Sequence, residues 1–205
     1  MANPPAPDGR TARLSRQTKE TKVELSLDLD GRGRSSAHTG VGFLDHMLDL
    51  LARHGRLDLE VSVHGDLETG SHHTVEDTGI VLGQALDQAL GDRRGIVRYG
   101  HAVVPMDEAR AACAIDVSGR PYCACEGFER LPPGAIAGFE HETAEEFFRA
   151  VASAARLTLH LELQAGTNAH HMIEACFKAF ARALRVAVAV DPGETGVPST
   201  KGTLT

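Results

Sequence analysis

The pattern His-His-x-x-Glu occurs twice in the sequence, and its residue types are those that bind metal ions. The two copies begin 98 positions apart and consist of His72, His73 and Glu76, and of His170, His171 and Glu174. On a helix, residues four positions apart lie on the same face, so the first histidine and the glutamate of each copy converge on one point. The second histidine points about 100° away, because a helix has 3.6 residues per turn. Each copy can therefore serve two metal ions, one in each direction.

Two further residues stand at matched distances before these copies. His46 precedes the first copy by 26 residues, Glu146 precedes the second by 24, and each lies close to a phenylalanine in a short predicted helix. One copy alone would be better explained by histidines that face solvent or cap a helix, whereas two copies in matched contexts favour metal binding. Imidazole and carboxylate ligands without thiolate admit Mn, Fe, Ni, Co or Zn, and the sequence does not choose among them. Because the histidines are adjacent, the zinc-protease pattern His-Glu-x-x-His is excluded.

A second group of residues is suited to binding phosphate. It comprises basic side chains and a short C-terminal stretch: Arg98, Arg120, Lys178 and residues 198–202 (PSTKG). Arginine, lysine and a serine hydroxyl donate the hydrogen bonds that phosphate oxygens accept. Solvated surface charge is the alternative for each residue taken singly. No Walker loop of the form G-x-x-x-x-G-K-[ST] is present, which excludes nucleotide hydrolysis of that type.

The four cysteines predict neither a disulfide framework nor a zinc–thiolate site. Cys123 and Cys125 are two positions apart, which places both on one face of a strand, and no pair has C-x-x-C spacing. We expect all four, Cys113 and Cys176 included, to be small buried side chains in a reducing compartment.

The composition is that of a globular protein with an acidic net charge. The 205 residues (21.9 kDa) are 42% apolar, and 21 basic against 28 acidic residues give a net charge of −7. A chain with a negative net charge is poorly suited to binding the phosphates of nucleic acids. No run approaches 18 apolar residues, and the Pro-rich, polar N-terminus lacks the apolar core of a secretory signal. We therefore expect a cytoplasmic protein without membrane or nucleic-acid partners.

Hydrophobic periodicity predicts two successive sets of strands and helices. The first set is expected at residues 19–30 (strand), 43–54 (helix), 57–63 (strand) and 72–90 (helix). The second is expected at residues 99–104, 109–117 and 122–128 (strands), 143–155 (helix), 157–163 (strand) and 170–190 (helix). The repeated order and the two His-His-x-x-Glu copies indicate an internal duplication. The expected division is a flexible tail at 1–12, an α+β half at 13–93, a second half at 94–190 and a phosphate-binding C-terminal tail at 191–205.

Six ordered blocks resemble the signatures of the imidazoleglycerol-phosphate dehydratase family. They are residues 43–48 (FLDHML), 72–77 (HHTVED), 106–109 (MDEA), 116–120 (DVSGR), 166–179 (GTNAHHMIEACFKA) and 198–202 (PSTKG). The resemblance runs from about Arg16 to Leu204, nearly the whole chain. It implies an α+β fold of two similar halves, each a small mixed sheet covered by helices on one face, as in the second domain of ribosomal protein S5. It also implies trimers assembled into a 24-subunit particle, with two Mn²⁺ ions in each active site between subunits.

The resemblance also implies a reaction and a role for individual residues. The reaction is the dehydration of imidazoleglycerol phosphate to imidazole-acetol phosphate in histidine biosynthesis. The residues that the resemblance implies as metal ligands are His46, His72, His73, Glu76, His170, His171 and Glu174. The residues that the resemblance implies as ligands of the substrate phosphate are Arg98, Arg120, Ser199 and Lys201. A further substrate contact falls to Lys178, and substrate contact with proton transfer falls to Glu20.

Two positions depart from the family pattern. Glu146 stands where the family usually has a histidine ligand, and Leu50 stands where many members have a glutamine that contacts the substrate. Thr143-x-x-Glu146 also fits a helix capping box, in which the carboxylate would bond back to the Thr143 backbone N–H. We favour metal coordination by Glu146, with the cap as the alternative.

The chemistry of this substrate explains why a metal is expected. The proton on C2 of the glycerol chain is not acidic, so a lone base cannot start the elimination. A metal-stabilised imidazolate could expel the C1 hydroxyl, after which a carboxylate such as Glu20 could remove the C2 proton. Two alternatives stay open: a non-catalytic metal-binding cage protein descended from the enzyme, and a dinuclear phosphohydrolase. The phosphate-binding residues argue against the first, and the missing Asp-rich bridging set argues against the second.

Overall fold

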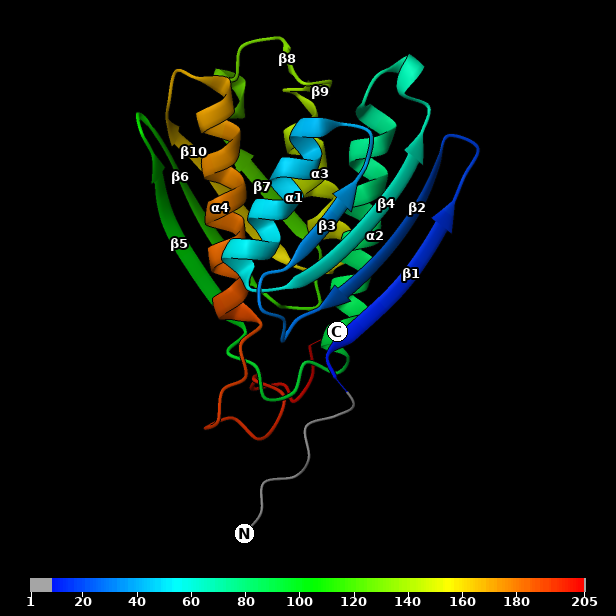
Figure 1. Cartoon of the computed structure of the whole chain (residues 1–205). Coiled ribbons are helices and arrows are strands. Elements are labelled where there is room, and N and C mark those ends of the chain that lie inside the picture. Colours follow the sequence, from blue (N-terminus) through cyan, green and yellow to red (C-terminus); the bar gives the residue numbers. More distant parts are fainter. Residues whose placement is uncertain (1–8, 205) are drawn as a thin grey trace.

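The computed structural model describes residues 9–204, and its elements form two halves built on the same plan (Figure 1). The first half contains β1 (Thr11–Gln17), β2 (Thr21–Asp28), β3 (Ser35–His38), α1 (Gly42–Gly55), β4 (Asp58–Gly65), the 3-10 turn η1 (Leu67–Thr69) and α2 (His72–Leu90). The second half contains β5 (Tyr99–Met106), β6 (Ala109–Asp116), β7 (Tyr122–Glu126), α3 (Thr143–Ala154), β10 (Thr158–Ala165) and α4 (Ala169–Ala187). Between β7 and α3 the second half has an insertion with η2 (Phe128–Arg130), β8 (Ala135–Ile136) and β9 (Phe139–Glu140).

The two four-stranded sheets have the same topology, which confirms the duplicated α+β fold. Their strand orders are β1-β2-β4-β3 and β5-β6-β10-β7. In each sheet the last strand of the order pairs in parallel and the other neighbours are antiparallel. Alternate residues of the central strands face the interior: Val23 opposite Val63, Leu25 opposite Val61 and Leu27 opposite Leu59. This period of two is what places one face of each sheet in the core.

The four long helices form a middle layer with one sheet on either side (Figure 1). Across this layer α1 packs against α4 and α2 packs against α3, so each pair joins the two halves. The α2–α3 contact is close because glycines face it: a Cβ on Gly83 would stand 2.7 Å from the Val151 carbonyl oxygen, and one on Gly79 would stand 2.9 Å from that of Phe147. The core is therefore shared by the halves.

The periodicity of the sequence predicted neither the edge strands β1 and β3 nor the two-residue strands β8 and β9, and some predicted boundaries were wrong. β1 and β3 lie at the two edges of the first sheet, and both are mostly polar. Residues 1–8 of the predicted tail lie outside the described residues, but Thr11 and Ala12 already belong to β1, so the first half begins earlier than predicted. The last helix ends at Ala187 instead of Val190. Among the described residues, none of the helices combines the length and apolar character that a membrane span needs.

Candidate functional site

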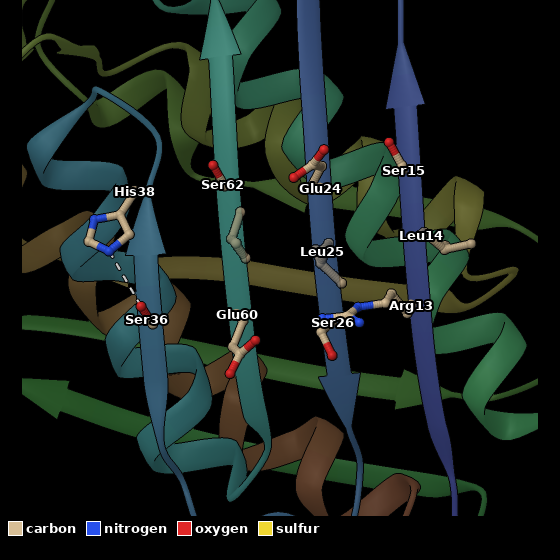
Figure 2. A pocket seen from close by; sticks show the side chains of 11 residues that line it. Arg13, Leu14, Ser15, Glu24, Leu25, Ser26, Ser36, His38, Glu60 and Ser62 are labelled. Carbon is tan, nitrogen blue, oxygen red and sulfur yellow. Dashed lines mark hydrogen bonds between the residues drawn. The ribbon is translucent and has the colours of Figure 1, made fainter.

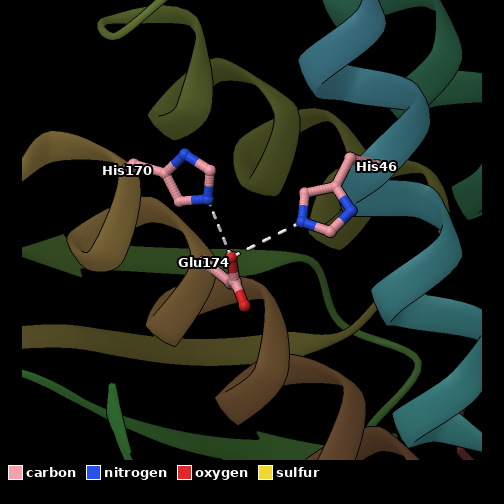
Figure 3. A group of neighbouring side chains, drawn as sticks. All are labelled: His46, His170 and Glu174. Carbon is pink, nitrogen blue, oxygen red and sulfur yellow. Dashed lines mark hydrogen bonds and ion pairs between the residues drawn. The ribbon is translucent and has the colours of Figure 1, made fainter. Parts of the chain in front are cut away.

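His46 of α1 and His170 and Glu174 of α4 bring their side chains together between the two halves (Figure 3). Their three candidate ligand atoms lie within 4.8 Å of one another. Oε2 of Glu174 is 3.0 Å from Nε2 of His170 and 3.5 Å from Nε2 of His46. The Phe43 ring packs edge-on against the His170 imidazole, with centroids 4.9 Å apart. Two imidazole nitrogens and one carboxylate oxygen at this spacing can hold a divalent transition-metal ion.

Glu174 keeps a negative charge although it is nearly buried. Its side chain is 7% exposed, and burial by itself raises the pKa of a carboxyl group. The Lys178 ammonium, 2.6 Å from Oε1, and the neighbouring imidazoles outweigh that effect and lower the pKa of Glu174. Lys178 therefore neutralises one oxygen of Glu174, and the other oxygen faces the two histidines. This is where the structure places Lys178, which the sequence predicts as a substrate contact.

The second histidine of each copy is held through its Nδ1 atom by a carboxylate. Nδ1 of His73 is 3.0 Å from Asp66 Oδ2, and Nδ1 of His171 is 2.7 Å from Glu108 Oε2. These hydrogen bonds raise the pKa of both histidines. Histidines that ligate metals typically donate their other ring N–H to a carboxylate, which fixes the tautomer and leaves Nε2 available. Asp66 and Glu108 are functional candidates that the sequence reasoning missed.

A hairpin carboxylate stands beside the free Nε2 atom of each of these histidines. Oε1 of Glu20, in the β1–β2 turn, is 3.9 Å from Nε2 of His73. In the second half, Oδ2 of Asp107, in the β5–β6 turn, is 3.8 Å from Nε2 of His171. Asp107 has φ = 47°, a left-handed conformation that aspartate tolerates better than most residues. The duplication thus sets a carboxylate beside each second histidine, and only Glu20 was singled out from the sequence.

Asp77, at the end of the first copy's block, fixes the hairpin that carries Glu20. Its Oδ1 atom is 2.6 Å from Nη1 of Arg16, and its Oδ2 atom accepts a hydrogen bond from the Thr21 hydroxyl. The Asp77 side chain is 10% exposed. Because Asp77 lies on α2 and its partners flank the β1–β2 turn, it ties the position of Glu20 to that of the histidines.

His72, Glu76 and Glu146, the ligands predicted for a second ion, are not gathered as closely: among the described residues only His46, His170 and Glu174 form a compact group of candidate ligands. Nε2 of His72 is 3.6 Å from Oε2 of Glu76. Glu76 and Glu146 both line a cavity of about 420 Å³ between the helices, with Arg149 beside them. His46 and Glu146 are equivalent positions, because the residues that follow them include fully buried pairs 100 positions apart: Met47 and Phe147, Leu48 and Phe148, and Leu51 and Val151. Glu146 therefore relates to the first copy as His46 relates to the second.

The capping-box alternative for Glu146 is wrong. α3 begins at Thr143, its N-cap residue is Glu142, and no side-chain hydrogen bond caps the helix. The Thr143 hydroxyl instead donates to the carbonyl oxygen of Glu140, 2.6 Å away. Thr143 thus already lies inside the helix, one position too late to cap it. Metal coordination by Glu146 stays a prediction.

The insertion in the second half holds the start of α2. Oε2 of Glu140 accepts hydrogen bonds from the Ser71 hydroxyl and from the Ser71 backbone N–H, 2.9 Å away. These bonds lower the pKa of Glu140, although burial opposes the shift. Ser71 immediately precedes His72, so a residue from one half orients the first histidine of the other. At the corresponding start of α4, Asn168 accepts from the His170 backbone N–H at 2.9 Å.

Apart from Lys178, which contacts Glu174, the residues predicted to bind phosphate lie at the opposite end of the molecule from the histidines. The His-His-x-x-Glu copies occupy the first turns of α2 and α4, whereas the C-terminal stretch follows the far end of α4, which is roughly 28 Å long. Figure 1 shows the stretch after α4 below the helix layer, with the two copies above. One chain alone therefore does not bring Ser199 or Lys201 to the metal-binding residues.

Arg98 is engaged within its own chain. Its Nε and Nη2 atoms are 2.7 and 3.0 Å from the two oxygens of Asp116, and Nη1 donates to the Pro198 carbonyl at 2.8 Å. The Asp116 carboxylate raises the pKa of Arg98. Arg98 thereby holds the C-terminal stretch in place, while Arg120 and Lys201 are exposed at the same end. Leu50 is half-buried against the core.

A hollow on the first sheet is not where these residues gather. It has a volume of about 500 Å³ and lies on the outer face of β1, β2, β4 and β3 (Figure 2). Its lining is solvent-facing strand residues such as Arg13, Glu24 and Glu60, and it includes no predicted site residue. The candidate site therefore lies at the end of the molecule where α2 and α4 begin.

Comparison with known proteins identifies a single family. A model described as imidazoleglycerol-phosphate dehydratase matches residues 39–184. The imidazoleglycerol-phosphate dehydratase of Xanthobacter autotrophicus is 57% identical over 196 residues, which cover 95% of this chain and 98% of the relative. That of Moorella thermoacetica is 56% identical over 195 residues, which cover 95% and 98%.

Two solved structures carry the same name. The crystal structure of imidazoleglycerol-phosphate dehydratase from Staphylococcus aureus superposes with a TM-score of 0.79 at 42% identity, covering 88% of this chain and 99% of that one. The enzyme from Pyrococcus furiosus, solved in complex with (S)-C348, gives a TM-score of 0.79 at 35% identity and covers 93% and 100%. The match in sequence and in fold extends over both halves.

Proposed function

The chain belongs to the imidazoleglycerol-phosphate dehydratase family, a hydro-lyase of histidine biosynthesis, and we propose that its dehydration reaction depends on metal ions held by the two His-His-x-x-Glu copies. The observation that carries the proposal is the convergence of His46, His170 and Glu174, which come from the two halves of the chain. A buried carboxylate that stays ionised beside two imidazoles is suited to a cation.

The donor set fits two ions of the Mn²⁺ type in each active site. Nitrogen and oxygen ligands without thiolate suit such ions. One ion would be held by His46, His170 and Glu174, and the other by His72, Glu76 and Glu146. The Nε2 atoms of His73 and His171 lie on the outside of the same end, fixed by Asp66 and Glu108. We propose that they complete the sites of neighbouring copies.

The chain's own residues then bind the substrate and move its protons. A metal ion bound to the substrate's imidazole ring supplies Lewis acidity that favours loss of the C1 hydroxyl. Glu20 is exposed on its hairpin, and within residues 9–204 its carboxylate has only the long contact with His73, so it is placed to accept the C2 proton. Arg120, Ser199 and Lys201 would donate hydrogen bonds to the phosphate, with Arg98 holding their stretch of chain.

Such a site requires more than one copy of the chain. Glu20 and the histidines lie at one end and Lys201 lies at the other, so a substrate that touches both needs residues from two chains. This supports self-association, and a 24-subunit particle built from trimers is the assembly we propose. The proposal also keeps the cytoplasmic location expected from the sequence.

The comparisons do not favour a non-catalytic cage protein. A storage shell has no use for a phosphate-binding stretch or for the paired hairpin carboxylates. Purified protein should convert imidazoleglycerol phosphate to imidazole-acetol phosphate, a chelator should abolish the conversion, and added Mn²⁺ should restore it. NMR of the product mixture is the measurement. Conversion that survives complete metal removal would overturn the metal dependence, and no conversion with Mn²⁺ present would favour the cage.

A further inference from the structure

Two cysteines on strand β7 form a close pair that the dehydratase reaction does not use. The Sγ atoms of Cys123 and Cys125 are 3.6 Å apart. Both side chains are half-buried on the face of β7 that meets α3, whereas Ala124 between them lines a hollow on the outer face of the sheet. β7 is the edge strand of its sheet and pairs only with β10. The pair therefore stands at a rim of the fold.

Small molecules can reach this rim. Cys125 lines an open cavity of about 660 Å³ together with polar and charged residues such as Arg110, Glu126 and Glu162. The other two cysteines are different: Cys113 and Cys176 are 3% and 1% exposed, and burial raises the pKa of both thiols. The expectation of inert buried cysteines thus holds for these two but not for the pair on β7.

The surroundings of the pair favour one thiolate. A hydrogen bond from the Cys125 thiol to the Cys123 sulfur lowers the pKa of Cys123 and raises that of Cys125, and the charge of Arg149 on α3 acts in the same direction on Cys123. Glu145, which is paired with Arg149, opposes this effect of Arg149. Partly exposed cysteines whose thiol pKa is lowered are the ones that react.

Strand geometry decides what the pair can bind. Residues two apart on a strand have Cα atoms about 6.6 Å apart, close to the upper limit of about 6.8 Å for a disulfide, so a direct S–S bond would require β7 to shorten. A single atom bridging the sulfurs requires no such change: two thiolates on one tetrahedral ion with bonds of about 2.3 Å are about 3.8 Å apart. The observed 3.6 Å is close to that separation.

We propose that Cys123 and Cys125 form a dithiol site for a soft, thiophilic metal or metalloid ion, separate from the nitrogen and oxygen ligands of the active site. Thiolates select soft ions, and the histidine and carboxylate set selects harder ones. Trivalent arsenic is the probe that needs no third protein ligand. Phenylarsine oxide reacts with two thiols to form two As–S bonds and release one water, with arsenic trivalent throughout and neither sulfur oxidised.

Intact-mass spectrometry of the native protein treated with phenylarsine oxide tests the proposal. One phenylarsenic group per chain should be added, and alkylation before digestion should find Cys123 and Cys125 protected. A dithiol competitor should remove the group and a monothiol should not. Cys123→Ser and Cys125→Ser should each lose the addition, whereas Cys176→Ser, the matched control, should keep it.

Three results would overturn the site. They are no addition to the native protein, addition that survives in Cys123→Ser, and protection of Cys113 or Cys176 instead of the β7 pair. Because protection is mapped on the unchanged protein, the result does not depend on whether a serine variant folds. Manganese content measured in the same samples should be unaltered, since the pair lies outside the histidine and carboxylate groups.

Discussion

Replacing Glu146 by alanine separates metal coordination from structural support. α3 has no side-chain cap, and Glu146 is half-buried in the α2–α3 cavity with Glu76. Since the side chain makes no capping bond, Glu146→Ala should change the free energy of unfolding of the metal-free protein by less than about 0.5 kcal/mol. Loss of a cap would instead cost about 1 kcal/mol, or roughly 2–4 °C in Tm for a chain of this size.

Metal binding should respond far more strongly. Losing even a residue that only orients a ligand weakens binding by about 10- to 100-fold, so loss of one of three candidate ligands at this site should weaken the second ion at least that much. Metal content after dialysis should fall from two ions per chain toward one, and activity should fall with it. Glu146→His, which restores the ligand type of the equivalent His46, should keep both ions.

Glu145→Ala is the matched control for this experiment. Glu145 is the adjacent residue on the same helix, and its carboxylate accepts hydrogen bonds from Arg149 on the helix surface. Its removal should leave the metal content at two ions. If Glu146→Ala retained both ions and lost only thermal stability, coordination by Glu146 would be refuted and the second site would rest on His72 and Glu76 alone.

Four further predictions follow from the same geometry. Asp66→Asn should weaken metal binding by about 10- to 100-fold, because Nδ1 of His73 loses its carboxylate partner; titration with Mn²⁺ measures it, and unchanged affinity would contradict the role. Lys201→Ala should raise KM by an amount that corresponds to about 1.5–3 kcal/mol, with metal content unchanged. Steady-state kinetics measures this, and an unaltered KM would mean that Lys201 is an ordinary surface lysine. Light scattering should find a particle far larger than the 21.9 kDa chain, and a monomer would exclude shared sites. Co-refolding the impaired variants Lys201→Ala and His72→Ala should give more activity at low substrate concentration than either variant alone, because intact sites form where each chain supplies what the other lacks; no gain would place both residues in one chain's site.

The helices and the central strands were predictable because burial imposes a clear period on them. α2 runs from His72 to Leu90, as its apolar spacing and Gly91 predicted. β1 was missed because, as an edge strand, it buries little besides Ala12 and has charged and polar neighbours. β3, with the sequence SSAH, has no large apolar residue at all. Because they bury so little apolar surface, β1 and β3 leave no pattern of side chains to detect and are held mainly by backbone pairing.

The candidate site was predictable where one helix builds it and not where packing does. The i and i+4 spacing placed His170 beside Glu174 from the sequence alone. The approach of His46 depends on how α1 crosses α4, which no local pattern encodes. Asp66 and Glu108 stand 7 and 63 residues away in the sequence from the histidines that they contact. Asp107 and Glu108 lie in the family-like block 106–109, but their residue types and spacing alone predict no role for them.

The crosswise pairing of α1 with α4 and α2 with α3 is the arrangement that two identical half-length chains would adopt about a two-fold axis. In such a symmetric pair, both metal-binding groups would carry the same residues, and a substitution in one would necessarily appear in the other. Fusion of the halves removes that constraint. If Glu146 coordinates metal as predicted, the histidine at position 46 and the glutamate at position 146 would let each group be adjusted alone, so one fold could hold two ions of unequal affinity.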